Sequence, residues 1–563
     1  MEGYIKTSSK GIQPVFEWWM AQIEASEKEK NAALYADRWP LWDEWYEADF
    51  PAGWYIKNIF FMMERSLVPR LYLQNPKVTL TTKRSDEGYQ EYAKLFTGLD
   101  NRIIDLSGGK NEFKKATQIA FRYGAGIIQA GFGSSIGGLT LEEAPEKDDF
   151  VYDLDQISRN DMPWIKAIHP KDFGLAAGVA RIKDSFFSYQ FIERSIDDII
   201  NDPRLKNTHE LWKQYDVHTT DQPQEKISLI EIRDRRYQKV IIYAKDFPSD
   251  PIVFENDLMQ SKYGLPFDIL TFNPSPSSVW GTPDSKVLEP FQNEMNDLKK
   301  QISKQAHSIA TKILSEKDNF SSTEKEKMVS TDSEAIVEAK KISKVKLFAI
   351  GDIPTSLLNA VNTIMDDARE TVGFSRNAFG AYEPGSRDIT ATEAQIVRSS
   401  GEIKIDERRD NLFDTMKRLM QHVHIAITNF MTPDDVIDIL GEEAKDQFEK
   451  FKVSSIDPTF FDVTIHPESS VLETSESQER RALSTYAIFK DNPLINQQEF
   501  LTQTLLKVRD LEPEKLVTAP VPQAPAGAEE NPLAALLQGA GGGSPLPSPS
   551  PQIQAGPPIG GDQ

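Results

Sequence analysis

Cysteine is absent from all 563 residues of this sequence. A disulfide framework, a thiolate metal site and a cysteine nucleophile are therefore excluded. Long hydrophobic runs are also missing, because no apolar stretch approaches the roughly 18 residues that a membrane-spanning helix needs. Residues 1–11 lack the apolar segment of a secretory signal. We therefore expect a protein that is made and used in a cytoplasm, without membrane contact.

Positive charge is scarce relative to negative charge. The chain has 64 Lys and Arg residues against 86 Asp and Glu residues, which gives a formal net charge of −22. This balance argues against a protein that grips DNA, because such proteins carry a basic footprint. It is compatible with a protein that encloses DNA without adhering to it, since carboxylates repel phosphates. Taken alone, the charge favours the simpler explanation of solubility.

Patterns that mark a catalytic site are missing as well. His422 and His424 lie two residues apart, so a helix would point them to different faces, and no G-x-S-x-G motif occurs. The glycines within 131–138 lack the spacing of a phosphate-binding loop and favour a hairpin turn. Asp153 and Asp155 could ligate a divalent cation, but a solvated loop is favoured because no further ligand has a suitable spacing. We expect no catalytic residues, no metal, no cofactor and no enzymatic activity.

The most regular hydrophobic pattern lies in residues 282–314. Its apolar residues recur in steps of three and four, which places them in one stripe on a helix. Pro283 suits the first turn of that helix, which would be about 46 Å long. The stripe consists of Val287, Phe291, Met295, Leu298, Ile302, Ala306, Ile309 and Ile313. Taken alone, this pattern is typical of a long core helix or a coiled coil.

A second helix is predicted after a polar insert of about 40 residues. Its stripe begins at Leu357 and ends at Val372, and Gly373 is a suitable terminator. The two helices and the insert would form a helical hairpin with the insert at its far end. A Gly/Pro-rich loop follows at 374–389, and the capping box at 390–393 starts a third long helix that runs toward Phe430.

The remaining sequence predicts further helices and strands around these three helices. Six of the nine tryptophans lie in the first 54 residues, and such a cluster favours a packing surface against another subunit or domain. Residues 60–275 predict an α+β unit. Its expected helices lie at 58–73 and 111–123, and its strands at 78–82, 127–130, 164–168, 177–183, 186–190, 227–234 and 237–243. Helices are also expected at 434–451, 480–489 and 497–508, a strand at 460–465, and disorder from Ala519 onward.

The order of these parts resembles the portal proteins of tailed bacteriophages, which are the head–tail connectors of the capsid vertex. The resemblance covers roughly residues 60–430 and rests on short motifs in the same order along the chain. These are Tyr72-Leu-Gln-Asn-Pro-Lys-Val78, Tyr123-Gly-Ala-Gly126, Ile168-His-Pro-Lys-Asp-Phe173, Trp280-Gly281 before a helix with Gln292 and Asn296, and Gly373 followed by Thr390-Ala-Thr-Glu-Ala394.

The resemblance implies a fold class and a division of the chain. The expected fold is a predominantly helical α+β portal fold with wing, stem, clip and crown, assembled into a ring around a central channel. The expected parts are an N-terminal aromatic region and wing at 1–280, stem helices at 281–314 and 353–373, a clip at 315–352, a tunnel loop at 374–389, a long wing helix and wing return at 390–470, a crown at 471–518 and a disordered tail at 519–563.

The resemblance also implies a role, partners and site residues. The role is genome packaging and ejection in a virion that is assembled in the host cytoplasm. The partners would be identical subunits, usually twelve in all, double-stranded DNA in the channel, the large terminase, the major capsid protein and head-completion or tail adaptor proteins. The tunnel-loop residues nearest the DNA would be Tyr382, Glu383, Ser386 and Arg387, and the stem stripe between subunits would be Phe291, Met295, Leu298, Ile302 and Ile309.

Two interpretations stay open at this stage. Lys299, Lys300 and Lys304 could form a basic belt in the stem, although a solvated helix face is favoured for long charged side chains. The alternative to a portal is another phage structural protein, such as a tail or scaffold component built on coiled coils.

Overall fold

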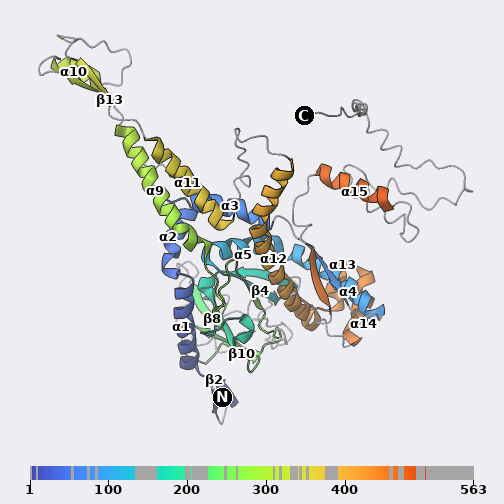
Figure 1. The fold of residues 1–563 in the computed structure, drawn as a ribbon. Helices are drawn as coiled ribbons and strands as arrows, with labels where there is room; N and C mark the ends of the chain where they lie inside the picture. Colours follow the sequence, from blue (N-terminus) through green and yellow to red (C-terminus); the bar gives the residue numbers. More distant parts are fainter. Residues whose placement is uncertain are drawn as a thin grey trace, which may run out of the picture. The chain divides into compact units, whose positions relative to one another are not determined.

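Strands and helices are mixed along the whole of the described chain in a computed structural model (Figure 1). The structure describes residues 3–7, 11–51, 56–72, 76–82, 87–133, 162–196, 199, 205, 226–245, 250–260, 264–308, 311–315, 320–329, 340, 345–349, 354–373, 391–454, 461–466, 475–489 and 501. Two compact units, residues 1–472 and 473–563, divide the chain. In the second unit, α15 (Ser475–Phe489) confirms the helix expected at 480–489.

The expected predominantly helical portal fold is wrong as a fold class. Of the described residues, 58% are helical and 20% lie in strands, and the strands form several antiparallel sheets. The protein is therefore a mixed α+β structure. The error has a physical cause, because the helical stripes can be found within a single segment, whereas most sheet partners are distant in sequence.

The described N-terminal tryptophans pack largely against other parts of the same chain. The hairpin of β1 (Tyr4–Thr7) and β2 (Gly11–Pro14) precedes α1 (Phe16–Ala33), η1 (Ala36–Arg38) and α2 (Trp39–Tyr46). Trp19 and Trp42 have no exposed surface, and Trp45 is also buried. Burial of these large side chains is a major contribution to the stability of this region.

The largest sheet has the strand order β10-β9-β8-β7-β6 and is antiparallel throughout. Its strands are β6 (Phe173–Leu175), β7 (Phe187–Ser195), β8 (Lys226–Asp234), β9 (Lys239–Ala244) and β10 (Val253–Asn256). The expected hairpin within 227–243 is confirmed. The strand expected at 177–183 is wrong, because Gly178 has a φ of +76° and η4 (Ile182–Asp184) follows it.

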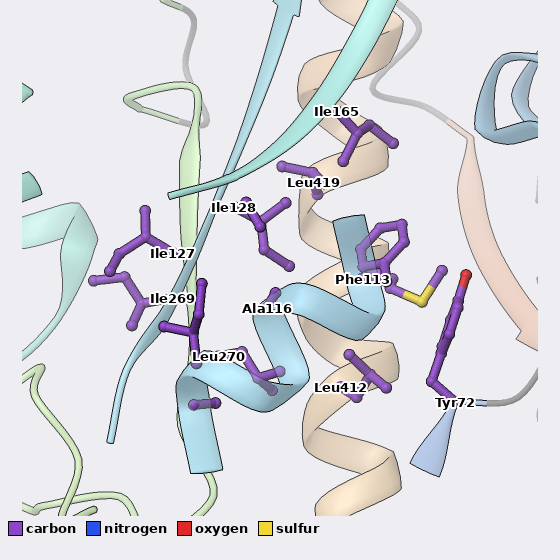
Figure 2. Packing of buried hydrophobic residues seen from close by; sticks show 14 of the residues in the cluster. Tyr72, Phe113, Ala116, Ile127, Ile128, Ile165, Ile269, Leu270, Leu412 and Leu419 are labelled. Atoms are coloured by element: carbon purple, nitrogen blue, oxygen red, sulfur yellow. The ribbon is translucent and has the colours of Figure 1, made fainter. Parts of the chain in front are cut away.

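A three-stranded sheet forms the centre of the main core. It consists of β11 (Phe267–Leu270), β4 (Gly126–Phe132) and β5 (Pro163–Ile168) in that order, next to α5 (Gly109–Tyr123) and α12 (Ala391–Phe430). Figure 2 shows side chains of the sheet and the two helices in this core, among them Ile128 of β4, Phe113 of α5 and Leu419 of α12, which belong to one buried cluster. All seven residues of β4 are buried.

A third sheet joins segments that are far apart in sequence. β3 (Lys77–Thr81), which follows α3 (Ile59–Leu71) in sequence, pairs with β14 (Asp462–His466) next to α4 (Glu87–Leu106) and α12. The single helix expected at 434–451 is wrong. It is divided into α13 (Pro433–Leu440) and α14 (Glu442–Ser454), because Gly441 adopts a φ of +93°, which does not continue a helix.

The helical hairpin is present, but its first helix is shorter than expected. α9 (Asp284–Ser308) ends six residues before the expected end at Leu314, and β12 (Thr311–Ser315) pairs with β13 (Val345–Ala349). The pairing explains why the helix stops, since those residues take part in a sheet. α10 (Ser322–Val329) lies between the two strands in sequence, and α11 (Thr355–Val372) confirms the predicted second helix.

Candidate functional site

The helix pair of α9 and α11 contains most of the apolar stripe that the sequence predicts in residues 282–314. The two helices lie side by side (Figure 1). Met295 has no exposed surface, Ile302 is 8% exposed, and both share a buried cluster with Met365 of α11. The expectation that Met295 and Ile302 pack between subunits is therefore wrong, because they pack within one chain.

The other members of the stripe differ in their surroundings. Phe291 and Leu298 are half-buried and pack against the same cluster. Ile309 lies outside the described residues. The described part of the stripe therefore explains how α9 packs against α11 within one chain.

A buried ion pair fixes the beginning of α9 to the middle of α12. Both terminal nitrogens of Arg408 reach the carboxylate of Asp284, with Nη2–Oδ1 at 2.7 Å and Nη1–Oδ2 at 3.2 Å. Burial raises the pKa of Asp284, and the Arg408 guanidinium opposes that rise. Asp284 also lies in the first turn of α9, where the helix dipole favours a negative charge. This fork-shaped contact specifies the orientation of α9 relative to α12.

A second set of polar contacts joins the same part of α9 to the N-terminal region. The Trp42 indole N–H donates to Glu289 Oε2 at 3.2 Å. Gln292 accepts from the backbone N–H of Ile59 at 2.7 Å and donates to Asn296 Oδ1 at 2.7 Å. The motif residues Gln292 and Asn296 thus satisfy buried polar groups, which would be costly to leave unpaired. Their role in this structure is to attach α9 to α3.

Two glycines of separate motifs approach each other where α5 ends and α9 begins. Gly124 has a φ of +87°, and a side chain on it would lie 2.6 Å from the carbonyl oxygen of Gly281. A side chain on Gly281 would in turn lie 2.8 Å from the carbonyl oxygen of Gly124. Only glycine allows this approach at both positions. The structure therefore gives a physical reason for two of the motifs that carried the sequence resemblance.

The end of α11 is attached to α12 by a similar contact. Gly373 adopts a φ of +97°, and its backbone N–H donates to the carbonyl oxygens of Arg369 and Glu370. Lys404 Nζ donates to the same carbonyl of Glu370 at 3.1 Å. A cation at this position also interacts favourably with the negative end of the helix dipole. Both ends of the pair that face the α+β body are thus connected to α12.

Basic side chains gather on the pair, and the sequence identified only some of them. Lys299 is half-buried, while Lys300 and Lys304 are exposed. The pKa of Lys57 is lowered, first by burial and then by the charges of Arg369 and Lys299, while Asp366 opposes the shift. Lys57 and Arg369 come from segments far from α9 in sequence, so no spacing rule could have placed them beside Lys299.

The predicted tunnel-loop residues Tyr382, Glu383, Ser386 and Arg387 lie outside the described residues. So do most of the predicted clip and the acidic segment with Asp153 and Asp155. The predicted roles of these residues stay predictions.

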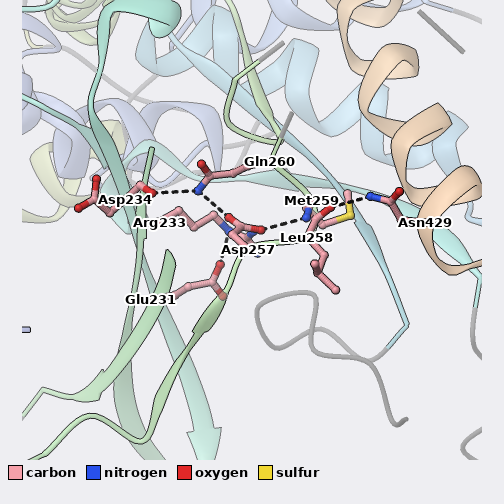
Figure 3. A network of polar contacts seen from close by, with 8 residues as sticks. All are labelled: Glu231, Arg233, Asp234, Asp257, Leu258, Met259, Gln260 and Asn429. Carbon is pink, nitrogen blue, oxygen red and sulfur yellow. Dashed lines mark hydrogen bonds and ion pairs between the residues drawn. The ribbon is translucent and has the colours of Figure 1, made fainter. Parts of the chain in front are cut away.

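One further buried polar network binds secondary-structure elements together through paired charges. Arg233 Nε donates to Glu231 at 2.7 Å, and Arg233 Nη1 contacts both oxygens of Asp257 at 2.7 and 2.8 Å (Figure 3). Gln260 Nε2 donates to Asp257 at 2.8 Å, and Asn429 of α12 donates to the carbonyl of Leu258 at 2.9 Å. Each charge in this network is paired, so we assign it to the stability of the body.

Within the described ranges, no group of three or more His, Asp or Glu side chains is placed to hold a metal ion. None of the described helices combines the length and the hydrophobicity needed to cross a membrane. No protein-family model matches the chain, and no curated protein matches it significantly.

Proposed function

We propose that this chain is one subunit of a ring-shaped portal, through which double-stranded DNA is packaged into a capsid and later ejected. The proposal concerns role and assembly and does not depend on a predominantly helical fold. It rests on the order of the sequence motifs and on one structural observation. The α9–α11 pair is held to the α+β body by the buried Asp284–Arg408 contact, while β12 and β13 beyond the pair form a separate two-stranded sheet among the strands that the structure describes.

This arrangement supports the proposal because one end of the helix pair is anchored in the α+β body, while the other end would be available to partner proteins. In a ring, the anchored ends would line up around the channel, and the module at 311–349 would be the docking place for terminase and adaptor proteins. The loop at 374–389, with Tyr382, Glu383, Ser386 and Arg387, would reach the DNA. The net charge of −22 suits a channel along which DNA slides without adhering.

The outer surfaces of the pair suggest how neighbouring copies meet. Lys300 and Lys304 are exposed on α9, and Asp367 and Glu370 are exposed on α11. In a cyclic ring, one face of each subunit meets the opposite face of the next. Lysines of one copy would then face carboxylates of its neighbour, which would favour this pairing over the reverse one.

The proposal is tested by the native mass and the electron-microscopic image of the purified full chain. We expect closed rings with an axial hole and a mass close to twelve times 63.6 kDa. A monomer or dimer at all concentrations would refute the proposal, and open filaments would favour a tail component.

Charge-reversal variants test the suggested contact between copies. The double variant Lys300→Glu/Lys304→Glu should dissociate rings at a salt concentration that the wild-type ring tolerates. Adding Asp367→Lys and Glu370→Lys should restore the ring, because the charges are then exchanged across the interface. Lys239→Glu, a change on β9 of the body, serves as the matched control and should leave the ring intact.

A further inference from the structure

A cavity of about 450 Å³ lies between α5, β5, η3 (Pro170–Asp172) and β7. Cavities that hold small molecules in proteins have volumes of about 300–1,000 Å³. Part of the wall is apolar and is formed by Ile119 of α5, Ile168 of β5 and Ile192 of β7. The cavity is therefore large enough for a small organic molecule, and its apolar wall can contact an uncharged part of that molecule.

Four charged side chains of the wall have no partner within the described ranges. Lys115 of α5, Lys166 of β5, Asp172 of η3 and Glu193 of β7 all line the cavity. Asp172 is half-buried, and the other three are exposed. None of the four side chains forms a hydrogen bond or an ion pair with another described residue, so neither lysine is paired with either acid across the cavity.

A third cation of the wall, Arg122 of α5, is already paired. Its Nε and Nη2 atoms donate to the two oxygens of Glu64 at 2.6 and 2.9 Å, and the Glu64 carboxylate is buried. A bidentate contact of this kind satisfies both groups. The four charges without a partner are two positive and two negative ones, so a ligand that carries one charge of each sign can satisfy both kinds.

His169, the residue before η3, adds a hydrogen-bond donor to the wall. Its Nδ1 accepts the backbone N–H of Lys171 at 3.1 Å. The ring lies edge-on to the rings of Trp39 and Tyr123, with centroid distances of 5.4 and 4.4 Å. A neutral imidazole whose Nδ1 is an acceptor carries its hydrogen on Nε2. Within the described part of the chain, no acceptor is recorded for this Nε2–H, so it can donate to a ligand.

The two ends of the η3 turn differ in their electrostatic surroundings. Burial lowers the pKa of His169 to about 4, and further lowering comes from the charges of Lys171, Lys30, Lys115 and Arg122. Burial raises the pKa of Asp172 against the charges of Lys171 and Lys30, while Glu193 adds to the rise and Lys166 opposes it. An anionic group is therefore favoured beside Lys115 and His169. A cationic group is favoured beside Asp172 and Glu193, since these two acids outnumber Lys166 in the wall.

We propose that this cavity binds a small zwitterion, a molecule in which a short apolar chain joins a carboxylate to an ammonium group. The carboxylate would accept hydrogen bonds from Lys115 Nζ and from the Nε2–H of His169. The ammonium group would donate to the carboxylates of Asp172 and Glu193. The apolar chain would lie against the apolar part of the wall. Amino acids belong to this chemical class.

Three probes of equal chain length test the proposal with the full-length chain at neutral pH, by ligand-observed NMR titration. ε-Aminocaproate carries both charges, caproate carries only the negative one, and hexylamine carries only the positive one. We expect ε-aminocaproate to bind about tenfold more tightly than either of the others, because each of these lacks the partly exposed ion pairs of one end. This advantage should shrink at high salt, which screens exposed charges.

Variants of the chain test which side chain binds each charge. Lys115→Gln should weaken the binding of ε-aminocaproate and caproate about fivefold and leave that of hexylamine unchanged. Glu193→Gln should weaken the binding of ε-aminocaproate and hexylamine and leave that of caproate unchanged. Both side chains are exposed, so the fold should persist. Lys110→Gln changes an exposed lysine of α5 outside the cavity wall and is the matched control.

Several results would overturn the proposal. It fails if caproate or hexylamine binds as tightly as ε-aminocaproate, which would make the cavity a site for a single charge. It also fails if ε-aminocaproate does not bind at millimolar concentration, because the four side chains would then be ordinary solvated charges. A third contrary result is that Lys115→Gln or Glu193→Gln binds ε-aminocaproate as tightly as Lys110→Gln does. None of these outcomes depends on ring formation, so the portal proposal is tested separately.

Discussion

Removal of the Arg408 side chain is the most direct test of how α9 is anchored. In Arg408→Met, the carboxylate of Asp284 would remain buried without its partner. Breaking a buried ion pair on one side costs about 3–5 kcal/mol. The guanidinium carbon also lies 5.4 Å from the centre of the Phe272 ring, and the loss of this contact adds roughly 0.5–1 kcal/mol. We therefore expect a decrease of about 4 kcal/mol in the free energy of unfolding at pH 7.

The pH dependence of this loss has a defined sign. Without Arg408, burial is opposed only by the hydrogen bond from Asn273, so the pKa of Asp284 should rise further above its ordinary value. Between the unfolded and the folded pKa, the folded state then binds more protons, and stability falls as pH rises. The difference between variant and wild type should therefore be largest near neutral pH and should shrink as the pH is lowered toward the ordinary pKa of an aspartate, about 4.

Urea unfolding, followed by the fluorescence of the buried tryptophans, measures this difference. Asp284→Asn provides the control, because adding it to Arg408→Met removes the stranded charge and should recover much of the loss. The reasoning would be refuted if Arg408→Met cost less than about 1 kcal/mol, the range of an exposed pair. A loss that is independent of pH, or that Asn at 284 does not recover, would also refute it.

Three further predictions use the same unfolding assay. Gly124→Ala should lower the free energy of unfolding by about 1–3 kcal/mol more than Gly178→Ala does. Both glycines have a positive φ, but only Gly124 lies against other backbone atoms. Equal losses for the two variants would contradict the close approach of backbone to Gly124. Met295→Ala should lower the free energy of unfolding of the isolated subunit by about 2–5 kcal/mol. If the variant affected only assembly, Met295 would have to be assigned to the contact between subunits. Burial lowers the pKa of His422 to about 4, so the unfolded state binds more protons between that value and about 6.5, and stability should fall as pH falls through this range. His422→Phe should weaken that fall, and an unchanged pH profile would assign it to other groups.

Sequence reasoning succeeded where one segment contains its own signal. The span of α11 followed from its stripe and from Gly373, and α5 followed in the same way from the segment that ends at Gly124. It failed where a strand from another part of the chain determines the structure of a segment. Ile313 continues the helical stripe in spacing, yet residues 311–315 form β12, because β13 offers a strand that only the folded chain brings near.

The same limit applies to the site. The stripe identified Met295 and Ile302 correctly as packing residues, but it could not show whether their partner was α11 or another subunit. In the sequence, Arg408 is one of many charged residues in the segment 402–410. No sequence pattern links it to Asp284, which lies 124 residues away.

The pairing of β3 with β14 has a consequence for synthesis of the protein. His466 lies opposite Lys77, so this sheet closes only after nearly the whole first unit has left the ribosome. Contacts of such long range slow folding, and until β14 arrives, the edge of β3 lacks its partner and can associate wrongly. A nascent chain that stops before β14 should therefore aggregate more readily than one that stops just after it.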